Sequence, residues 1–189
     1  MDVLAHALWA GLGVALARRR WAVPRRTAAL TVAAAAAPDL PHLLPIAGWA
    51  LTGRGTWASI KDYVYAMPGQ EPALPASVES LTHHLHCITH SAVIALVVTL
   101  LAWACLRRLW IPLLGWWSHI VIDVFTHSTD YYASPVLYPI TREGFDGLAW
   151  NEPWFMVLNY AALLAGAVWL LRTRRADAGD GPARSTLHR

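Results

Sequence analysis

Five apolar stretches, separated by glycine, proline and charged residues, most constrain what this chain can fold into. An apolar helix of about 20 residues crosses a bilayer, and only 14% of the residues are charged, against about a quarter in an ordinary soluble domain. We expect an all-α integral membrane bundle of about five transmembrane helices. The expected spans are Val3 to Ala17, Thr27 to about Ala47, Leu85 to Leu106, Leu109 to His127, and Trp154 to Leu171.

The arginines indicate how these spans are oriented, because cytoplasmic loops of membrane proteins concentrate Lys and Arg. Ten arginines follow the first, third and fifth spans, whereas the opposite connections hold three basic residues against seven acidic ones. We predict an N-out, C-in protein of the cell inner membrane, with the other side periplasmic or extracellular. The ten are Arg18, Arg19, Arg20, Arg25, Arg26, Arg107, Arg108, Arg172, Arg174 and Arg175.

We expect one membrane-embedded, metal-binding helical domain over residues 1–175, with outer loops at 52–81 and 128–153. Recurrent glycines and prolines predict little regular helix through most of residues 48–80, a loop that could cover a site. Small and polar residues predict a disordered cytoplasmic tail over 176–189. The partner implied is the lipid bilayer. A charge of +3, with arginines clustered beside apolar runs, argues against nucleic acid, and the sequence carries no signal for an oligomeric state.

Eight of the nine histidines lie toward the outer ends of the expected spans. At about 1.5 Å of rise per residue, counting from the arginines places His6, Asp39, His90, His119 and Asp123 at depths of roughly 16 to 25 Å. Four separate spans therefore bring metal-ligand side chains to one layer in the outer half of the membrane.

Helical spacing brings these side chains closer still. His86 and His90 are four residues apart, with His83 three residues earlier on the same face. His119 is likewise four residues from Asp123, which is four from His127. Side chains one helical turn apart can bind the same ion. We predict a metal site made by His6, Asp39, His86, His90, His119 and Asp123.

Structural roles compete with this prediction for several residues. Histidines can serve as the polar ends of interfacial helices, and this structural interpretation is favoured for His42, His83 and His84. His119 could simply be the hydrogen-bond partner of Asp123. The structural interpretation therefore stays open for these histidines.

For the two aspartates a structural role is the weaker interpretation. An intramembrane carboxylate is costly unless it is paired, so Asp39 and Asp123 are functional by default. For His127 the two interpretations are balanced.

Four segments carry a resemblance to a known family. They are His6 near the start, Pro38-Asp39-Leu40-Pro41-His42, His86-Cys87-Ile88-Thr89-His90-Ser91, and Gly115 with Ser118-His119, Asp123 and Thr126 before Tyr138-Pro139. In order and type they resemble a family of inner-membrane metal-dependent hydrolases, also described as LexA-binding. The resemblance covers roughly residues 1–140 and implies hydrolysis at a metal centre.

Two positions depart from that family's pattern. Pro41 stands where the family has a second aspartate, and Cys87 stands where it has an arginine. His127 is an addition that could compensate for the first change. The order of histidines and aspartates is also similar, more loosely, to zinc-dependent phospholipase C and related nucleases.

Histidine and carboxylate ligands suit zinc, with manganese and iron as alternatives. Six ligands exceed one tetrahedral site, so one or two ions are expected, with Asp39 or Asp123 bridging. Metal-activated water would attack an ester or phosphodiester, and Asp39, Asp123 and His127 are the candidate catalytic residues. At this depth a lipid substrate could arrive from the bilayer.

Other classes of protein remain open. A non-catalytic metal-binding membrane protein, such as a metal carrier or a regulatory or assembly partner, would use the same ligands. A transporter would place ligands near the midplane with broken helices, and a purely structural cluster is a third alternative. Glu143, Asp146 and Glu152 in the last outer loop could join the site, with Glu152 the first choice.

Overall fold

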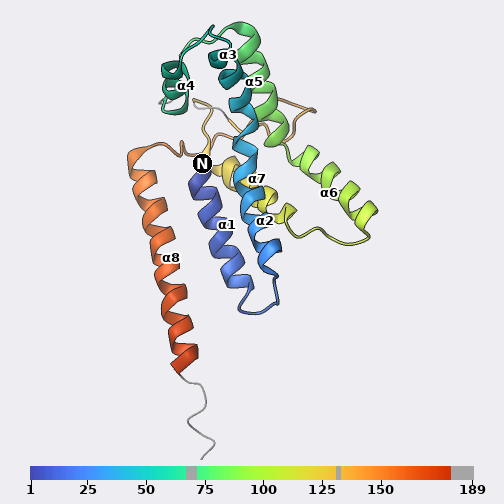
Figure 1. Cartoon of the computed structure of the whole chain (residues 1–189), viewed down its shortest axis with the longest axis vertical. Helices are drawn as coiled ribbons and strands as arrows, with labels where there is room; N and C mark the ends of the chain where they lie inside the picture. The colour runs from blue at the N-terminus through green and yellow to red at the C-terminus, as the bar shows by residue number, and fades with distance from the viewer. Residues whose placement is uncertain (67–71, 131–132, 180–189) are drawn as a thin grey trace, which may run out of the picture.

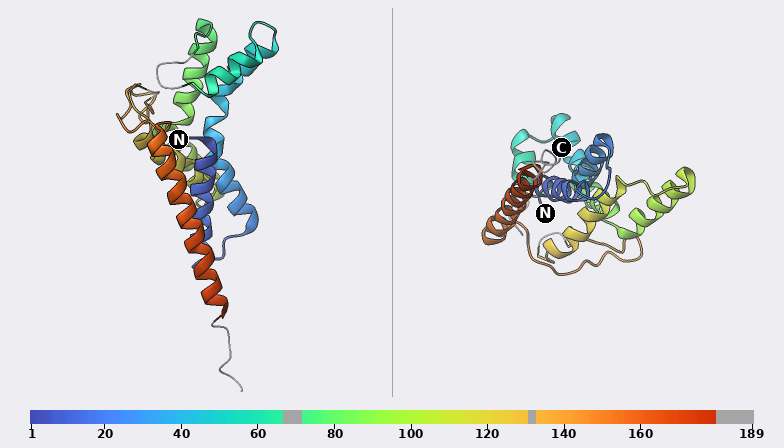
Figure 2. Two further views of the ribbon diagram at one scale, coloured as in Figure 1. Left: turned by 90° about the vertical axis from the view of Figure 1, so that its left-hand side faces the viewer. Right: turned by 90° about the horizontal axis from the view of Figure 1, so that it is seen from below.

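Three helices pack together at the centre of the molecule. The computed structural model describes residues 1–66, 72–130 and 133–179, and the regular elements among them are helices (Figure 1). α1 (Val3–Ala17) and α2 (Arg25–Ala36) pack against each other, and α7 (Leu113–Thr126) packs on both. α8 (Pro153–Gly179) lies alongside α1 (Figure 2).

The second expected span is interrupted rather than continuous. After α2 the chain makes two 3₁₀ turns, η1 (Ala37–Asp39) and η2 (Pro41–Leu43), before α3 (Leu44–Leu51). Pro38 and Pro41 explain the break, because proline has no N–H to donate and crowds the preceding helical turn. The break places Asp39 in a turn between two helices.

The third expected span, Leu85 to Leu106, is also divided. α5 (Ala76–Thr89) and α6 (Ala92–Leu106) meet at a bend of 54°. Ser91 starts the second helix, since its hydroxyl accepts a hydrogen bond from the Ile94 N–H at 3.1 Å. The bend therefore leaves His90 at the C-terminal end of α5, where it caps the helix.

The prediction of little helix over residues 48–80 is wrong for the described part of that loop. α4 (Trp57–Val64) forms there, capped by reciprocal hydrogen bonds between Thr56 and Ser59, and α5 begins at Ala76. Gly53 and Gly55 lie between α3 and α4, and Pro72 and Pro75 precede α5, whereas Gly48 lies within α3. Residues 67–71 lie outside the described residues.

Two or three of the described segments could cross a membrane. The stretch 25–51 and the segment Pro153–Arg175 are long and apolar enough to cross a membrane, and the bent α5–α6 pair would be a third span if it crosses as one. α1 and α7 are apolar but shorter. α8 continues through Gly179, into the segment expected to be a tail, and residues 180–189 lie outside the described ones.

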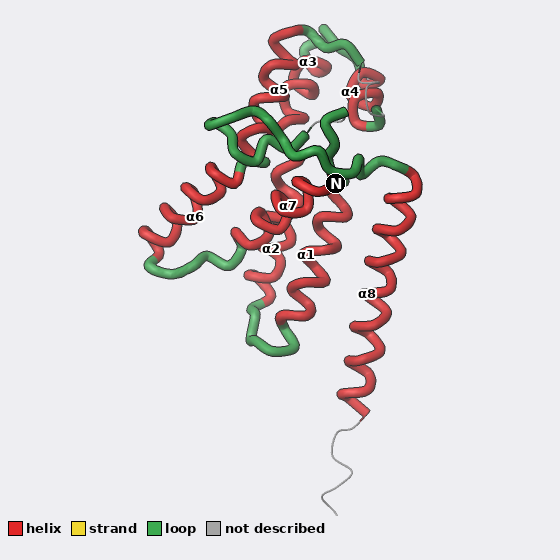
Figure 3. The backbone as a smooth tube through the Cα atoms, turned by 180° about the vertical axis from the view of Figure 1, so that it is seen from behind, coloured by secondary structure: helices red, strands yellow, loops and turns green. Residues whose placement is uncertain are grey.

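Two helix breaks and two helix ends lie at one level of the molecule. The start of α1, the break after α2, the α5–α6 bend and the end of α7 lie close together near its middle (Figure 1, Figure 3). The α1–α2 turn and the far end of α8 lie on the same side of this level, and there Arg19 donates to the Thr173 hydroxyl at 2.8 Å. Non-helical backbone thus concentrates where the predicted ligands lie.

Candidate metal centre

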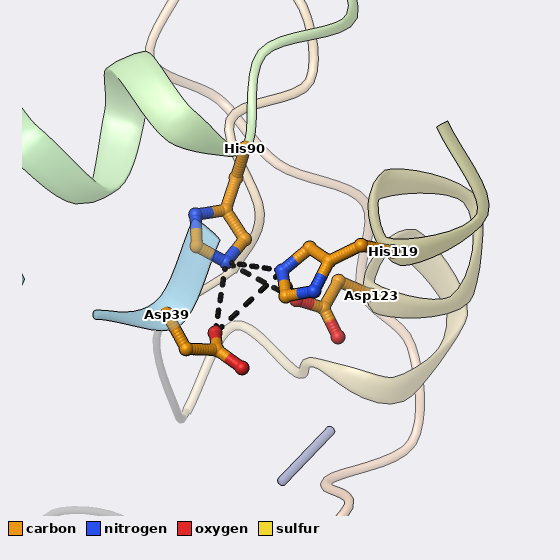
Figure 4. A group of neighbouring side chains, drawn as sticks. All are labelled: Asp39, His90, His119 and Asp123. Carbon is orange, nitrogen blue, oxygen red and sulfur yellow. Dashed lines mark hydrogen bonds and ion pairs between the residues drawn. The ribbon is translucent and has the colours of Figure 1, made fainter. Parts of the chain in front are cut away.

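Two aspartates and two histidines form a compact cluster at this level (Figure 4). Asp39, His90, His119 and Asp123 each present one ligand atom, and these atoms all lie within 4.8 Å of one another. His90, His119 and Asp123 are fully buried, and Asp39 is 8% exposed. The structure therefore brings together four of the six predicted ligands as a group that could hold a metal ion.

Gly115 allows the helix that carries two of these residues to approach α2. A Cβ at this position would lie 2.0 Å from the carbonyl oxygen of Thr31, far inside van der Waals contact. His119 and Asp123 follow Gly115 at four-residue intervals on the same face of α7. The close crossing of α2 and α7 therefore places both ligands against the η1 turn that carries Asp39.

Backbone carbonyls fix the orientation of both imidazole rings. His119 Nδ1 donates to the Ala35 carbonyl at 2.8 Å, and His90 Nδ1 donates to the His86 carbonyl at 2.9 Å. A carbonyl oxygen can only accept, so each Nδ1 must carry a proton. In the neutral ring this leaves a bare lone pair on Nε2, the arrangement typical of metal-binding histidines.

Both Nε2 atoms face each other and the carboxylates. They are 3.0 Å apart, and Asp123 Oδ2 lies 3.0 Å from that of His119 and 3.2 Å from that of His90. Asp39 Oδ1 lies 3.3 and 3.6 Å from those of His90 and His119, respectively. Two imidazole nitrogens and two carboxylates thus converge on one place, and such a set of ligand atoms could hold a metal ion.

The second oxygen of Asp123 is engaged away from the other ligands. Asp123 Oδ1 lies 2.9 Å from His6 Nε2, 3.4 Å from the Thr126 hydroxyl that donates to it, and against the Met1 amine. The His6 ring also stacks on His119 at 3.8 Å. His6 therefore reaches the cluster, as predicted, but its nearest contact orients Asp123.

The remaining predicted residues lie beside the cluster. The His86 ring stacks on His90 with centroids 3.8 Å apart, and His127 Nε2 lies 3.6 Å from Asp123 Oδ1. With Asp39 and His42, these two histidines line a cavity of about 420 Å³. Sequence reasoning favoured a structural role for His42, although its position three residues after Asp39 was an available signal.

The segment after α7 holds His127 in place. Gly147 N–H donates to the His127 carbonyl at 2.9 Å, and Trp150 N–H donates to the Thr126 carbonyl at 2.9 Å. A Cβ on Gly147 would lie 2.5 Å from the Phe125 carbonyl oxygen, so a side chain there would push this segment away.

Several residues weighed as candidates lie elsewhere. His83 and His84 are exposed, and the Tyr138 hydroxyl lies 3.1 Å from His84 Nδ1. This exposure agrees with the structural interpretation of both histidines and separates His83 from the buried face of His86 and His90.

The acidic residues of the last loop, Glu143, Asp146 and Glu152, are also exposed. Asp146 accepts hydrogen bonds from the backbone N–H and hydroxyl of Thr129 at 2.9 and 3.0 Å, and these lower the pKa of its carboxyl below the ordinary value of 3.8. Its role is to close the loop, and the first choice, Glu152, points to solvent.

Apolar membrane-type helices around a buried His/Asp cluster define a helical membrane protein with a potential metal centre. The chain belongs to the family described as YdjM inner membrane protein, which matches residues 1–180. No curated protein and no solved structure matches the chain. The match confirms the inner-membrane part of the resemblance, and with it a membrane location, but it does not extend to hydrolase activity or to the similarity with phospholipase C.

Proposed function

We propose that this protein is a membrane-bound, metal-dependent hydrolase that cleaves an ester or phosphodiester, with a lipid as its substrate. The observation that carries the proposal is the convergence of two imidazole Nε2 atoms and two carboxylates beside a cavity. Asp39 belongs to both, so a substrate group in the cavity would lie next to the metal position.

The lining of the cavity supports an amphiphilic substrate. Leu4 of α1, Tyr65 after α4, and Met156 of α8 contribute apolar and aromatic surface, whereas Asp39 and His127 contribute polar atoms. Apolar pockets with a few convergent polar groups are typical of ligand sites. A lipid chain could lie among the helices while its ester or phosphodiester meets the polar side.

Each residue of the cluster has a defined part in this scheme. Asp39, His90, His119 and Asp123 would hold the cation, with zinc the first choice and manganese or iron the alternatives. A bound cation supplies Lewis-acid activation of water and of the carbonyl or phosphoryl oxygen. With a single cation bound, His127 lies on the cavity and is placed to accept and return a proton, while His6 orients Asp123.

For the topology we propose five spans, N-out and C-in, with the cavity on the periplasmic or extracellular side. The contact between Arg19 and Thr173 supports this, because it brings the first and last arginine clusters together. Both clusters lie on one side of the level at which the four candidate metal ligands lie (Figure 1). Arginine-rich helix ends favour the cytoplasmic side of a membrane.

A non-catalytic metal-binding protein is the second candidate, and one observation favours it. Three of the four clustered ligands are fully buried, and structural metal sites are closed by protein ligands whereas catalytic sites keep a position open. In that case the metal would serve a carrier, regulatory or assembly role.

Turnover separates the two candidates. Purified, zinc-loaded protein in detergent is assayed on a panel of ester and phosphodiester lipids, alongside Asp123→Ala, His90→Ala and the exposed control His84→Ala. The proposal predicts hydrolysis by wild type and His84→Ala, and its loss in the other two. Hydrolysis that survives both cluster substitutions, or bound metal without turnover across the panel, would remove the enzymatic assignment.

A further inference from the structure

Three histidines line one cavity next to the first cluster. His42 comes from η2, His86 from α5, and His127 from the end of α7, and all three line the cavity together with Asp39. The His42 and His86 ring centroids are 5.7 Å apart, and those of His86 and His127 are 6.1 Å apart. Three separate segments thus bring imidazoles to one place.

These separations can be compared with those of rings that share one metal ion. With a metal–nitrogen distance of about 2.0–2.1 Å, each ring centroid lies roughly 3 Å from the ion, so tetrahedral ligands have centroids roughly 5 Å apart. The 4.8 Å between His90 and His119 matches this. The pairs around His86, at 5.7 and 6.1 Å, exceed it by roughly 1 Å, so these rings would have to close by that amount around an ion.

Stacked rings, by contrast, cannot both bind one tetrahedral ion. The His86 and His90 centroids are only 3.8 Å apart, with the ring planes 28° from parallel, which is too close for two tetrahedral ligands. His86 therefore cannot join His90 at the first position, and any cation that it binds must lie at a different one.

Two residues that line this cavity also carry orphaned atoms. Asp39 Oδ2 and His42 Nδ1 are both buried and have no hydrogen-bond partner among the described residues. A buried polar atom without a partner costs about 1–3 kcal/mol, so each of these atoms calls for a partner such as a water or an ion. Since Asp39 Oδ1 faces His90 and His119, its other oxygen is free to serve a different neighbour.

We propose that His42, His86 and His127 hold a second divalent cation, with Asp39 bridging the two positions. The inference rests on the proposed function, because the bridge requires a cation at the first cluster. Three neutral imidazoles supply no charge, and His42 is only half-buried. The second cation is therefore the weaker and more readily exchanged of the two.

Metal stoichiometry tests this assignment without reference to turnover. Purified protein is loaded with Co²⁺ or Mn²⁺ and washed, and its metal content is measured for wild type, His42→Ala, His127→Gln and the exposed control His84→Ala. We expect two ions per chain in wild type and His84→Ala, and one in the other two variants. Monodispersity on size-exclusion chromatography verifies that each variant is folded.

The Mn²⁺ form gives a second readout on the wild type alone. Two ions bridged by a carboxylate lie about 3.5–4 Å apart, so the electron paramagnetic resonance spectrum should show spin coupling, which a single ion lacks. One uncoupled ion per wild-type chain, or two ions retained in His42→Ala and His127→Gln, would overturn the inference. Either result leaves the proposed hydrolase standing if His90→Ala still abolishes turnover.

Discussion

The Nε2 atoms of His90 and His119 face each other at 3.0 Å, although the residues are 29 positions apart on different helices. Each ring is turned by a hydrogen bond from Nδ1 to a backbone carbonyl, so both lone pairs point into the same space. A cation bound between them would use both nitrogens as ligands. The α5–α6 bend and the α2–α7 crossing both contribute to it.

The crossing can be tested at Gly115. A Cβ would meet the backbone of Thr31, which cannot move aside as a side chain would. We expect Gly115→Ala to lower the free energy of unfolding by about 1–3 kcal/mol through overpacking, and to reduce metal content because His119 is displaced. Thermal unfolding followed by tryptophan fluorescence in detergent measures the first effect.

Gly11 of α1 provides the matched control for that substitution. Nothing lies within 4 Å of a Cβ added there, so Gly11→Ala should leave unfolding unchanged or slightly stabilised. Equal melting temperatures and metal contents for the two variants would argue against the close crossing.

The bend can be tested at Ser91. Its hydroxyl caps α6 through the Ile94 N–H and donates to the Tyr138 carbonyl, so both contacts hold the end of α5 where His90 sits. We expect Ser91→Ala to cost about 1–2 kcal/mol, as for other lost N-caps, and to weaken metal binding. The matched control is Ser118→Ala, whose hydroxyl bonds only the Gly115 carbonyl of its own helix. A similar loss in both would place the effect outside the cap.

The first helix and the ligand cluster show which parts of the structure could be predicted from the sequence. The range of α1, Val3–Ala17, is predicted correctly because the apolar run ends in arginines. The convergence of Asp39, His90, His119 and Asp123 also follows from depth and spacing. These residues could be predicted because the depth of each one can be counted along its own expected span.

The breaks in the helices could not be predicted from apolar character alone. Residues 85–106 form one apolar run in the sequence, yet the chain bends at Ser91. The Ser91 hydroxyl donates a hydrogen bond to the carbonyl of Tyr138, and such a tertiary contact cannot be predicted from apolar character. Likewise, the lone-pair directions of His90 and His119 depend on carbonyls of His86 and Ala35, and backbone acceptors carry no sequence signal.

The loop closure at Asp146 predicts a pH dependence. Hydrogen bonds from the backbone and hydroxyl of Thr129 lower the pKa of Asp146. Its folded pKa is therefore below its unfolded value, so its stabilisation is fully present above about pH 4 and is lost as the pH falls through the folded pKa. The melting-temperature difference between wild type and Asp146→Asn should shrink on acidification; a difference that stays constant would contradict this contact.

Metal removal should destabilise the protein. A cation bound only by the folded state, at a concentration about 100 times its dissociation constant, contributes about 2.7 kcal/mol. Incubation with a chelator should lower the melting temperature of wild type, and added zinc should restore it. Asp123→Asn, which retains the shape of the side chain without its charge, should show no response to either. A chelator response of equal size in Asp123→Asn would place the metal elsewhere.

The metal content of the purified protein tests the central claim most directly. Wild type, Asp123→Asn and the loop control Asp146→Asn are purified from the same membranes, and zinc, manganese and iron are quantified by mass spectrometry. Retention of bound metal by wild type and Asp146→Asn, with about a tenfold or greater loss in Asp123→Asn, is the predicted result. Wild type without metal, or with the same content as Asp123→Asn, would contradict the account and leave the histidines paired with carboxylates through protons.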